Sequence, residues 1–405
     1  MKRSLSALLL GSAMVLVAGA ALAQDKTVKI GALSDQSGLY ADLGGPGSTL
    51  AAQMAIEDSG LQKKGWKIDV ISGDHQNKPD IGSNIARQWF DVDKVDIIVD
   101  VPNSGVALAV NNVVKEKNGV YINSGAATSD LTNAQCSPNT VHWTYDTYML
   151  AHSTGSALVK AGGDSWFFLT ADYAFGAALE RDTTAVINSA GGKVVGGVKH
   201  PLNTSDFSSF LLQAQASKAK IVGLANAGGD TTNAIKQAAE FGIVSGGQKL
   251  AALLLFLTDV HSLGLPVAQG LNFTETFYWD LNDQSRAFAT RFQERMKNKQ
   301  KPTMIHAGVY AGVLHYLKVL DAMGGNPHDG AKVVAKMKAT PTDDPLFGKG
   351  TIREDGRKMH PAYLFEVKKP SESKGPWDYY KLVATVPAEQ AFTPLSESKC
   401  PLVKK

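Results

Sequence analysis

Residues 95–128 read VDIIVDVPNSGVALAVNNVVKEKNGVYINSGAAT, and they contain two short apolar runs on either side of a segment with helical periodicity. The run from Val95 to Val101 is typical of a buried parallel strand. After it, apolar side chains recur at helical spacing up to Lys117, at Val106, Val110, Val113 and Val114. We expect Gly119 to end this helix, as a C-terminal glycine commonly does. With Val120 to Asn123 as a second strand, the stretch predicts a β-α-β unit.

Both strands of this unit end in loops of small, hydroxyl-bearing residues. Pro102-Asn103-Ser104-Gly105 follows the first strand, and Ser124-Gly125-Ala126-Ala127-Thr128 follows the second. In an open α/β sheet, ligands collect at the carboxyl ends of the strands, and N–H groups at a helix start favour an anion. The two loops are therefore a candidate anion site. Ser104 as a helix N-cap and Thr128 as a turn residue would explain the same pattern without a ligand.

The same alternation of strand and helix extends on both sides of the unit. Before it, strands are expected at Val28–Leu33 and Trp66–Ser72, with helices beginning at Ser48 and Asp80. From Thr144 the alternation starts again, with strands at Trp166–Leu169, Val194–Val198, Ile221–Ala225 and Leu250–Leu255, and helices at Ala151–Ala161, Ala174–Ala190, Phe207–Ala216 and Thr231–Phe241. We expect an α/β fold with two doubly wound parallel-sheet lobes and a ligand cleft between them.

The C-terminal third changes the order of elements. A strand at Leu271–Trp279 is followed by helices at Gln284–Lys299, Thr303–Met323 and Lys332–Lys338, and then by strands at Thr351–Arg353 and Tyr363–Val367. This order suggests that the chain returns to each lobe in turn across a three-segment hinge near His142–Asp146, Tyr278–Asp283 and Gly348–Gly356. The expected division is 24–144 plus 281–350 for lobe 1, 145–280 plus 351–390 for lobe 2, and 391–405 for a C-terminal tail.

The N-terminus has the pattern of an exported chain. Lys2 and Arg3 precede an apolar run from Leu8 to Ala21, and Ala21-Leu22-Ala23 forms an A-x-A cleavage site. We expect residues 1–23 to be a cleavable signal peptide, which places the protein in the periplasm. An uncleaved anchor is the alternative, but the run is short for a membrane span. Without Lys2 and Arg3 the formal net charge falls from +3 to +1. No basic patch stands out, so we expect no nucleic acid partner.

The sequence contains two cysteines, Cys136 and Cys400. An even number in an exported chain predicts one disulfide, which would hold the C-terminal tail to the middle of the chain. Two isolated cysteines are a poor basis for a metal site, and the nine histidines lack the spacing of zinc ligands. We therefore expect no metal and no cofactor.

The sequence does not contain the motifs of common enzyme classes. It has no G-x-S-x-G, H-E-x-x-H or G-x-x-x-x-G-K-[ST] pattern. Gly44-Gly45-Pro46-Gly47-Ser48 is similar to a phosphate loop but has no lysine, and Ser104 has no evident base. We expect no catalytic residue and a protein that is not an enzyme. An exported hydrolase is the enzyme alternative.

Six short fragments carry a resemblance to a known family. In chain order they are GALS with SGLY from Gly31 to Tyr40, GGPG from Gly44, NSGVA from Asn103, NSGAAT from Asn123, DYAFG from Asp172 and TSDFS from Thr204. Together they resemble the type I periplasmic binding proteins of the leucine/isoleucine/valine-binding group, which are solute receptors of ABC importers. The resemblance covers nearly all of the chain after residue 23. It implies a monomer that captures a small ligand and delivers it to a membrane permease.

The resemblance also implies roles for individual residues. The family holds a ligand carboxylate on one lobe with donors at the positions of Ser104, Ala126 and Thr128, and closes on it with a tyrosine at the position of Tyr173. Charge-assisted hydrogen bonds of this kind are strong. The full set of predicted ligand-binding residues is Tyr40, Asn103, Ser104, Ala126, Ala127, Thr128, Tyr148, Tyr173, Asn226, Asp230, Phe256 and Trp279.

One departure from the family pattern concerns the ligand's amino group. Amino-acid binders of this group carry an acidic side chain after the strand that here is Ala251–Leu255, but Phe256-Leu257-Thr258 stands there. Asp259 and Asp230 are the other candidates. An apolar residue facing an ammonium would leave a buried charge unpaired. We therefore expect a carboxylate without an α-amino group, either an aromatic or a branched-chain acid, which includes 2-oxo acids. A branched-chain amino-acid receptor and a ligand-sensing subunit of a signalling receptor are the alternatives.

Overall fold

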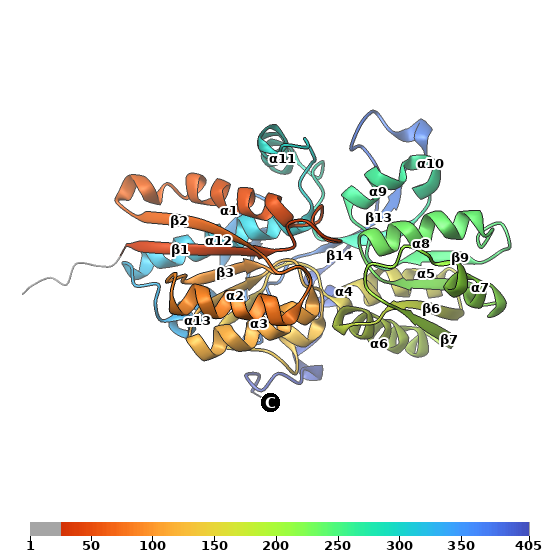
Figure 1. Ribbon diagram of the computed structural model, residues 1–405, viewed down its shortest axis with the longest axis horizontal. Coiled ribbons are helices and arrows are strands. Elements are labelled where there is room, and N and C mark those ends of the chain that lie inside the picture. Colours follow the sequence, from red (N-terminus) through yellow and green to blue (C-terminus); the bar gives the residue numbers. More distant parts are fainter. Residues whose placement is uncertain (1–25, 405) are drawn as a thin grey trace, which may run out of the picture.

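The computed structural model describes residues 26–404, and the predicted signal peptide lies outside them. Two parallel sheets occupy opposite halves of the molecule (Figure 1). The first has the order β2-β1-β3-β4-β5, with β1 at Thr27–Ser34, β2 at Lys67–Asp74, β3 at Ile97–Asp100, β4 at Val120–Asn123 and β5 at Thr140–His142. The second has the order β7-β6-β8-β9, with β6 at Ser165–Ala171, β7 at Lys193–His200, β8 at Ile221–Ala225 and β9 at Lys249–Ala252. The predicted fold class is confirmed.

Helices cover both faces of the first sheet. On one face, Val99 and Ile122 belong to an apolar cluster with α1 (Gly45–Ser59) and α12 (Met304–Met323). On the other, Ile98 and Tyr121 pack with α2 (Pro79–Asp91) and α3 (Ser104–Lys117). Strands buried on both faces appear in the sequence as continuous apolar runs. Within residues 26–404, no helix, not even the long apolar α12, could cross a membrane.

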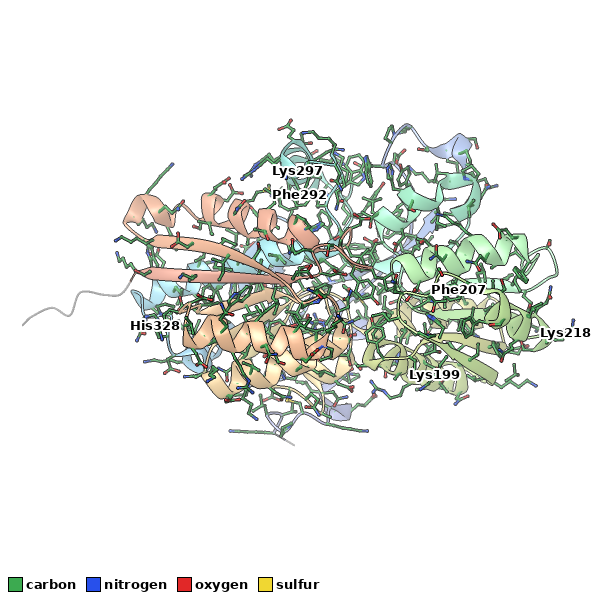
Figure 2. All side chains as sticks on the ribbon, in the orientation of Figure 1. Lys199, Phe207, Lys218, Phe292, Lys297 and His328 are labelled. Atoms are coloured by element: carbon green, nitrogen blue, oxygen red, sulfur yellow. A yellow bond between two sulfur atoms is a disulfide. The ribbon has the colours of Figure 1, made fainter. Side chains whose placement is uncertain are left out.

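The second sheet has its own helices and core. The predicted helices are present as α6 (Ala174–Ser189), α7 (Ser208–Ala216) and α8 (Gly229–Glu240). Phe207 lies in an apolar cluster confined to this half, whereas Phe292 belongs to a cluster that continues from the first half into the second (Figure 2). The two halves therefore share a continuous apolar contact.

A small antiparallel sheet lies beside the second parallel sheet. Its order is β10-β13-β14, with β10 at Asn272–Glu275, β13 at Ala362–Val367 and β14 at Tyr380–Val386. The sequence did not indicate β14, because this edge strand leaves Leu382 and Val383 half-exposed. The prediction of a strand at Thr351–Arg353 was wrong. The chain instead forms a hairpin of β11 (Thr342–Asp344) and β12 (Gly348–Gly350) and then turns at Gly356, where φ is +88°.

Several predicted helix boundaries require correction. The helix α3 begins at Ser104 with Asn103 as its N-cap, and the left-handed residue that ends it is Asn118 instead of the predicted Gly119. The helix α1 begins at Gly45 instead of Ser48, because Pro46 is favourable in a first turn. The remaining helices of the first half are α11 (Asp283–Arg295) and α13 (Gly330–Ala339), close to their predicted positions.

Two regions of the second half differ more strongly from the elements predicted for them. The predicted helix at Ala151–Ala161 begins earlier, at α4 (Thr147–Leu150), where the Asp146 side chain accepts the Met149 N–H at 2.8 Å. It continues through a π-helical turn, η3 (Ala151–Gly155), into α5 (Ser156–Lys160). The predicted strand Leu250–Leu255 is shorter, and α9 (Leu257–Leu263) and α10 (Leu265–Ala268) follow it. Neither helix was predicted.

Two of the three predicted crossing segments lie side by side. The His142 N–H donates to the Gly356 carbonyl at 2.9 Å, and the Lys358 N–H donates to the His142 carbonyl at 3.0 Å. The fully buried Arg357 guanidinium pairs with Asp146 at 3.1 Å. These contacts fix the first and third segments to each other.

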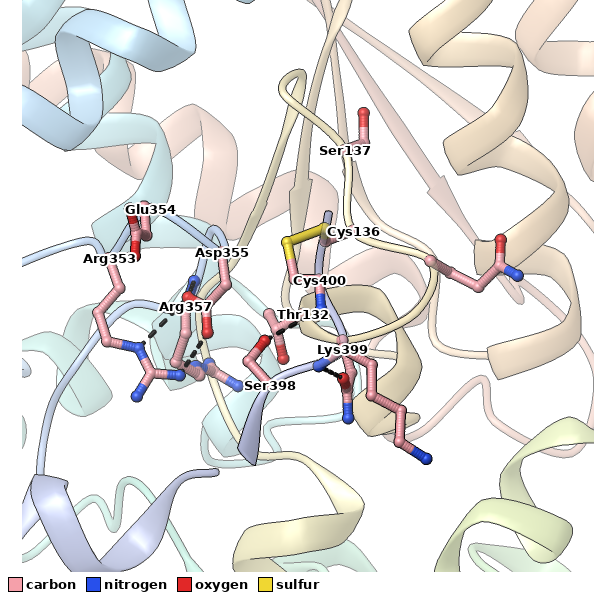
Figure 3. Close-up of a disulfide and its surroundings, with 12 residues drawn as sticks. Thr132, Cys136, Ser137, Arg353, Glu354, Asp355, Arg357, Ser398, Lys399 and Cys400 are labelled. Carbon is pink, nitrogen blue, oxygen red and sulfur yellow. Dashed lines mark hydrogen bonds and ion pairs between the residues drawn. A yellow bond between two sulfur atoms is a disulfide. The ribbon is translucent and has the colours of Figure 1, made fainter. Parts of the chain in front are cut away.

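The predicted disulfide between Cys136 and Cys400 is confirmed (Figure 3). After β14 the chain passes through α14 (Ala388–Ala391), and the Phe392 ring then stacks on the Arg357 guanidinium at 4.3 Å. The tail next reaches the loop beyond β4, where the disulfide holds it. The tail is thus packed on the crossing segments and fastened covalently.

Candidate functional site

A small cavity lies where the carboxyl ends of the two parallel sheets face each other. Its volume is about 10 Å³, which is at the lower limit of the space that can hold one water molecule. The lining residues come from both halves and are almost all apolar or aromatic: Tyr40, Leu43, Pro102, Gly125, Ala127, Tyr145, Tyr173, Phe175, Ala227, Leu254, Phe256 and Ile305. A ligand with an aromatic ring therefore needs the two halves to separate before it can enter.

Two tyrosines meet across this cavity. The hydroxyls of Tyr40, in the loop after β1, and Tyr173, at the start of α6, are 2.6 Å apart. Burial raises the pKa of both phenols well above the usual value, so both are protonated at neutral pH. One of the two protons is used within the pair, and no described residue accepts the other. The pair therefore offers one hydrogen-bond donor to the cavity.

Aromatic rings form most of the remaining wall. Tyr145 and Phe256 make an edge-to-face contact with ring centroids 5.8 Å apart. The Tyr145 hydroxyl donates to the Gly125 carbonyl at 2.5 Å, which fixes the ring against the first-sheet loop. Such walls suit a flat or branched apolar body.

The two loops predicted to hold an anion lie next to each other. The Thr128 N–H donates to Ser104 Oγ at 3.2 Å. The Ala126 N–H donates to the Asn123 side chain at 2.9 Å, and Asn103 caps α3. Thr128 caps a short 3₁₀ helix, and Asn103 takes the N-cap position of α3 that the ligand-free interpretation gave to Ser104. Of these loops, Gly125, Ala127 and Pro102 reach the cavity wall, while Asn103, Ser104, Ala126 and Thr128 do not line it.

Neither candidate carboxylate of the second half lines the cavity. Asp230 accepts the N–H groups of Asn203 and Thr204 at 3.1 and 2.8 Å, and burial raises its pKa to about 6. Asp259 accepts the Phe256 N–H at 2.9 Å at the start of α9, and burial raises its pKa to about 7. Among residues 26–404, the cavity wall contains no charged side chain.

Three further predicted residues lie away from the cavity. Asn226 is held by His200 and Thr231. Trp279 donates to the Trp377 carbonyl at 2.8 Å. Tyr148 stacks on the ring of His152 and borders a separate hollow of about 690 Å³ between α6 and the C-terminal tail.

Eight residues of the wall are absent from the predicted ligand-binding set, although Pro102 and Gly125 belong to the two predicted anion loops: Leu43, Pro102, Gly125, Tyr145, Phe175, Ala227, Leu254 and Ile305. Most of them follow a strand of one of the parallel sheets, and this position in the sequence could have identified them as candidate wall residues. Their apolar side chains have the same pattern as core residues, so the sequence did not separate the two roles.

A polar contact at the edge of the hollow between α6 and the C-terminal tail also joins the two halves. Asp182, on α6, accepts the hydroxyls of Ser129 and Thr147 at 2.8 and 2.6 Å. The neighbouring Arg181 donates to Ser129 Oγ at 2.9 Å and pairs with Asp130 at 3.2 Å. The described part of the chain contains no group of His, Cys, Asp and Glu that could hold a metal ion.

Comparisons with known proteins extend over almost the whole described chain. Residues 27–375 match the family described as periplasmic binding protein. The Leu/Ile/Val-binding protein homolog 6 of Brucella abortus is 26% identical over 365 residues, which cover 87% of this chain and 90% of that protein.

Two solved structures are similar at higher identity. A periplasmic binding protein from Burkholderia mallei is 54% identical with a TM-score of 0.90, covering 94% of this chain and all of the other. A branched chain amino acid ABC transporter periplasmic ligand-binding protein from Burkholderia xenovorans is 41% identical with a TM-score of 0.82. The match covers 93% of this chain and all of the other.

Two more distant structures share the fold. Both are ABC transporter solute-binding proteins of R. palustris, one in complex with benzoate (21% identity, TM-score 0.77) and one with 4-hydroxybenzoate (22%, 0.80). The benzoate complex matches 93% of this chain and 99% of its own chain. The 4-hydroxybenzoate complex matches 89% of this chain and 97% of its own chain.

Proposed function

The chain belongs to the periplasmic binding protein family, and from this we propose that its ligand is a small carboxylate with an aromatic or branched apolar body. The family's members are solute-binding proteins of ABC transporters and not enzymes. In this proposal the cleft between the two lobes captures the acid, and the closed monomer delivers it to a membrane permease. Membership implies a periplasmic location, and a cleavable signal peptide at residues 1–23 is part of the proposal.

The main support for this ligand is the composition of the cavity wall. Twelve residues line the cavity, and none of them is charged. An α-ammonium group in this space would lose its water without gaining a carboxylate, which is costly. A ring or branched chain is compatible with Tyr145, Phe256 and their apolar neighbours.

The ligand's carboxylate has donors available beside this wall. One donor is the spare proton of the Tyr40–Tyr173 pair. Others are Ser104 and Thr128, whose mutual 3.2 Å contact can be exchanged for contacts to an anion. Hydrogen bonds to a charged acceptor are stronger than the neutral contact that they replace.

The benzoate and 4-hydroxybenzoate complexes support the aromatic form of the ligand. Both proteins have this fold and bind a carboxylate on an apolar ring. The name of the 41% identical protein favours a second candidate, a branched-chain amino acid. That ligand would require Asp230 or Asp259 to leave its backbone N–H partners and turn toward the cavity.

A thermal-shift screen tests the proposal. Benzoate, 4-hydroxybenzoate, phenylpyruvate and 4-methyl-2-oxopentanoate are compared with phenylalanine, leucine, isoleucine and valine. A ligand at 100 times its Kd adds about 2.7 kcal/mol to the free energy of unfolding, which is easily measured. We expect stabilisation by at least one acid of the first group and by none of the amino acids. Stabilisation by the amino acids alone would contradict the proposal.

The division of residues also remains a proposal, with lobe 1 at 24–144 plus 281–350 and lobe 2 at 145–280 plus 351–390. A role in sensing is the alternative to uptake. Permease and ATPase genes beside this gene would favour uptake, and a neighbouring sensor kinase gene would favour sensing.

A further inference from the structure

A buried carboxyl group lies directly behind the wall of the cleft cavity. Asp100 is the last residue of β3, and its side chain is fully buried. A Cβ atom added to Gly125 would lie 2.4 Å from Asp100 Oδ1 and 2.6 Å from the Pro102 Cα. Because Gly125 and Pro102 both line the cavity, only the thickness of this backbone separates the carboxyl from the ligand space.

The backbone at this position turns sharply. Asp100 and Val101 have φ values of +78° and +59°, a conformation that costs energy for residues with a side chain. Strained backbone of this kind often accompanies a functional site. Here the turn holds the carboxyl beneath the loops that are expected to receive the ligand.

Asp100 has few partners for an ionised group. Its Oδ2 accepts the Ser34 hydroxyl at 2.8 Å, and Ser34 Oγ in turn accepts the Gly45 N–H at 2.8 Å. Ser48 faces the same carboxyl without a well-aligned hydrogen bond. Oδ1 has no partner within the described residues.

The titratable groups around Asp100 do not compensate its charge. Asp35, after β1, adds a second negative charge. Tyr121 on β4 and Tyr145 on the far side of Gly125 are protonated, because burial raises their pKa well above the usual value. His306, on α12, bonds the Gly44 carbonyl and is neutral at pH 7, because burial lowers its pKa to about 4. Burial accordingly raises the pKa of Asp100 to about 7.

A carboxylate ligand would place another negative charge on the opposite side of Gly125. Like charges within a few ångströms in a water-excluded site disfavour each other's ionisation. We propose that Asp100 takes up a proton from solvent when a carboxylate binds, and that this residue sets the pH range in which the protein accepts anions. The inference rests on the proposed function, since a neutral ligand would leave the proton balance unchanged.

Calorimetry in buffers of different ionisation enthalpy measures this proton directly. The probe is whichever of benzoate, 4-hydroxybenzoate, phenylpyruvate and 4-methyl-2-oxopentanoate binds most tightly at pH 6. The carboxyl group of each acid is ionised between pH 6 and 8.5, so titration of that group does not cause a pH effect in this range. We expect uptake of up to one proton per ligand near pH 7.5, and a Kd that rises by about tenfold per pH unit above pH 7.

Variants assign the proton to Asp100. The near-isosteric Asp100→Asn should bind with no proton uptake and with a flat Kd between pH 6 and 8.5. Asp259→Asn is the matched control, because Asp259 is also buried with a pKa near 7 but belongs to the second half, where it caps α9. It should retain the wild-type uptake. Ser34→Ala removes a hydrogen bond to the ionised carboxyl and should move the onset of the rise in Kd to higher pH.

Three results would overturn the inference. Binding without proton uptake in the wild type would reject it while leaving the proposed function intact. Loss of uptake in Asp259→Asn but not in Asp100→Asn would assign the proton elsewhere. If none of the four acids binds at pH 6, the proposed function fails and the inference fails with it. Should Asp100→Asn not fold, the shift expected for Ser34→Ala decides the assignment.

Discussion

The Tyr40 and Tyr173 hydroxyls are 2.6 Å apart and join the two lobes directly across the cleft cavity. Tyr40 belongs to a loop that Asp35 holds in place by accepting the Tyr40 N–H at 2.8 Å, and Tyr173 precedes α6. Each lobe therefore contributes one phenol from a fixed position. The pair can hold the closed arrangement and offer its spare proton to a ligand at the same time.

Removing one hydroxyl of this pair should weaken ligand binding. A hydrogen bond of this kind contributes about 0.5–1.5 kcal/mol, so Tyr40→Phe should raise the Kd of a bound acid about three- to tenfold. Tyr310→Phe is the matched control, because its hydroxyl is bonded to Asp58 outside the cavity. Calorimetry compares the two variants, and an equal loss of affinity in both would show that the effect is not local to the cleft.

A glycine at the lobe contact should be needed for closure. Gly228 has a φ of +58°, and an added Cβ would lie 3.0 Å from the Leu39 carbonyl oxygen and 3.1 Å from the Tyr40 ring. Gly228→Ala should therefore raise the Kd by tenfold or more and leave the liganded protein larger in small-angle scattering. Gly247→Ala has a similar backbone strain, with φ of +98°, but nothing within 4 Å of its Cβ. If Gly247→Ala weakens binding as much as Gly228→Ala, the proposed role of Gly228 in closure is contradicted.

The disulfide should stabilise the folded chain. It closes a loop across a sequence separation of 264 residues. Loss of such a crosslink typically costs about 2–5 kcal/mol. We expect a lower Tm after reduction, and no free thiol in the denatured, unreduced protein. The Cys136→Ser/Cys400→Ser double variant should show the reduced Tm with or without reductant, and a reductant effect on that variant would indicate another cause.

Asp100 should make the folded protein less stable as the pH rises. The unfolded carboxyl ionises near pH 4, whereas burial raises the folded pKa to about 7. Between these values the folded state binds more protons, so its unfolding free energy falls with pH and levels off above pH 7. The full penalty is about 4 kcal/mol at most.

The Asp100→Asn variant tests the direction in which the unfolding free energy changes with pH. It should gain stability relative to the wild type between pH 5 and pH 8 in urea unfolding. Asp321→Asn should behave oppositely, because the hydrogen bond from Lys64 lowers the pKa of Asp321 and its loss removes stability at pH 8. A pH-independent difference between wild type and Asp100→Asn would contradict the expected ionisation.

The sequence predicted most of the fold because the buried strands are apolar throughout. The strand Ile221–Ala225 has the predicted boundaries, and the two lobes follow from the strand-helix alternation. The edge strand β14 was missed, because pairing with β13 fixes it while its side chains stay exposed. The π-helical turn at Ala151–Gly155 has no local sequence signal.

The site was predictable only in part. Ala127 was expected from its strand-end loop, Tyr173 from the family resemblance, and Tyr40 and Phe256 as aromatic residues near the cleft, and all four reach the cavity. Tyr148 and Trp279 are aromatic residues of the same kind, but tertiary packing turns them toward His152 and Trp377. The closeness of Asp100 to Gly125 depends on two positive φ angles, which no sequence period encodes.

Calorimetry with matched ligand pairs tests the central claim most directly. Phenylpyruvate is compared with phenylalanine, and 4-methyl-2-oxopentanoate with leucine, at pH 6. An unpaired buried charge costs roughly 3–5 kcal/mol, which corresponds to a hundredfold or more in affinity. We expect at least one oxo acid to bind a hundredfold more tightly than its amino acid. Micromolar binding of leucine or phenylalanine without binding of the matching oxo acid would contradict it.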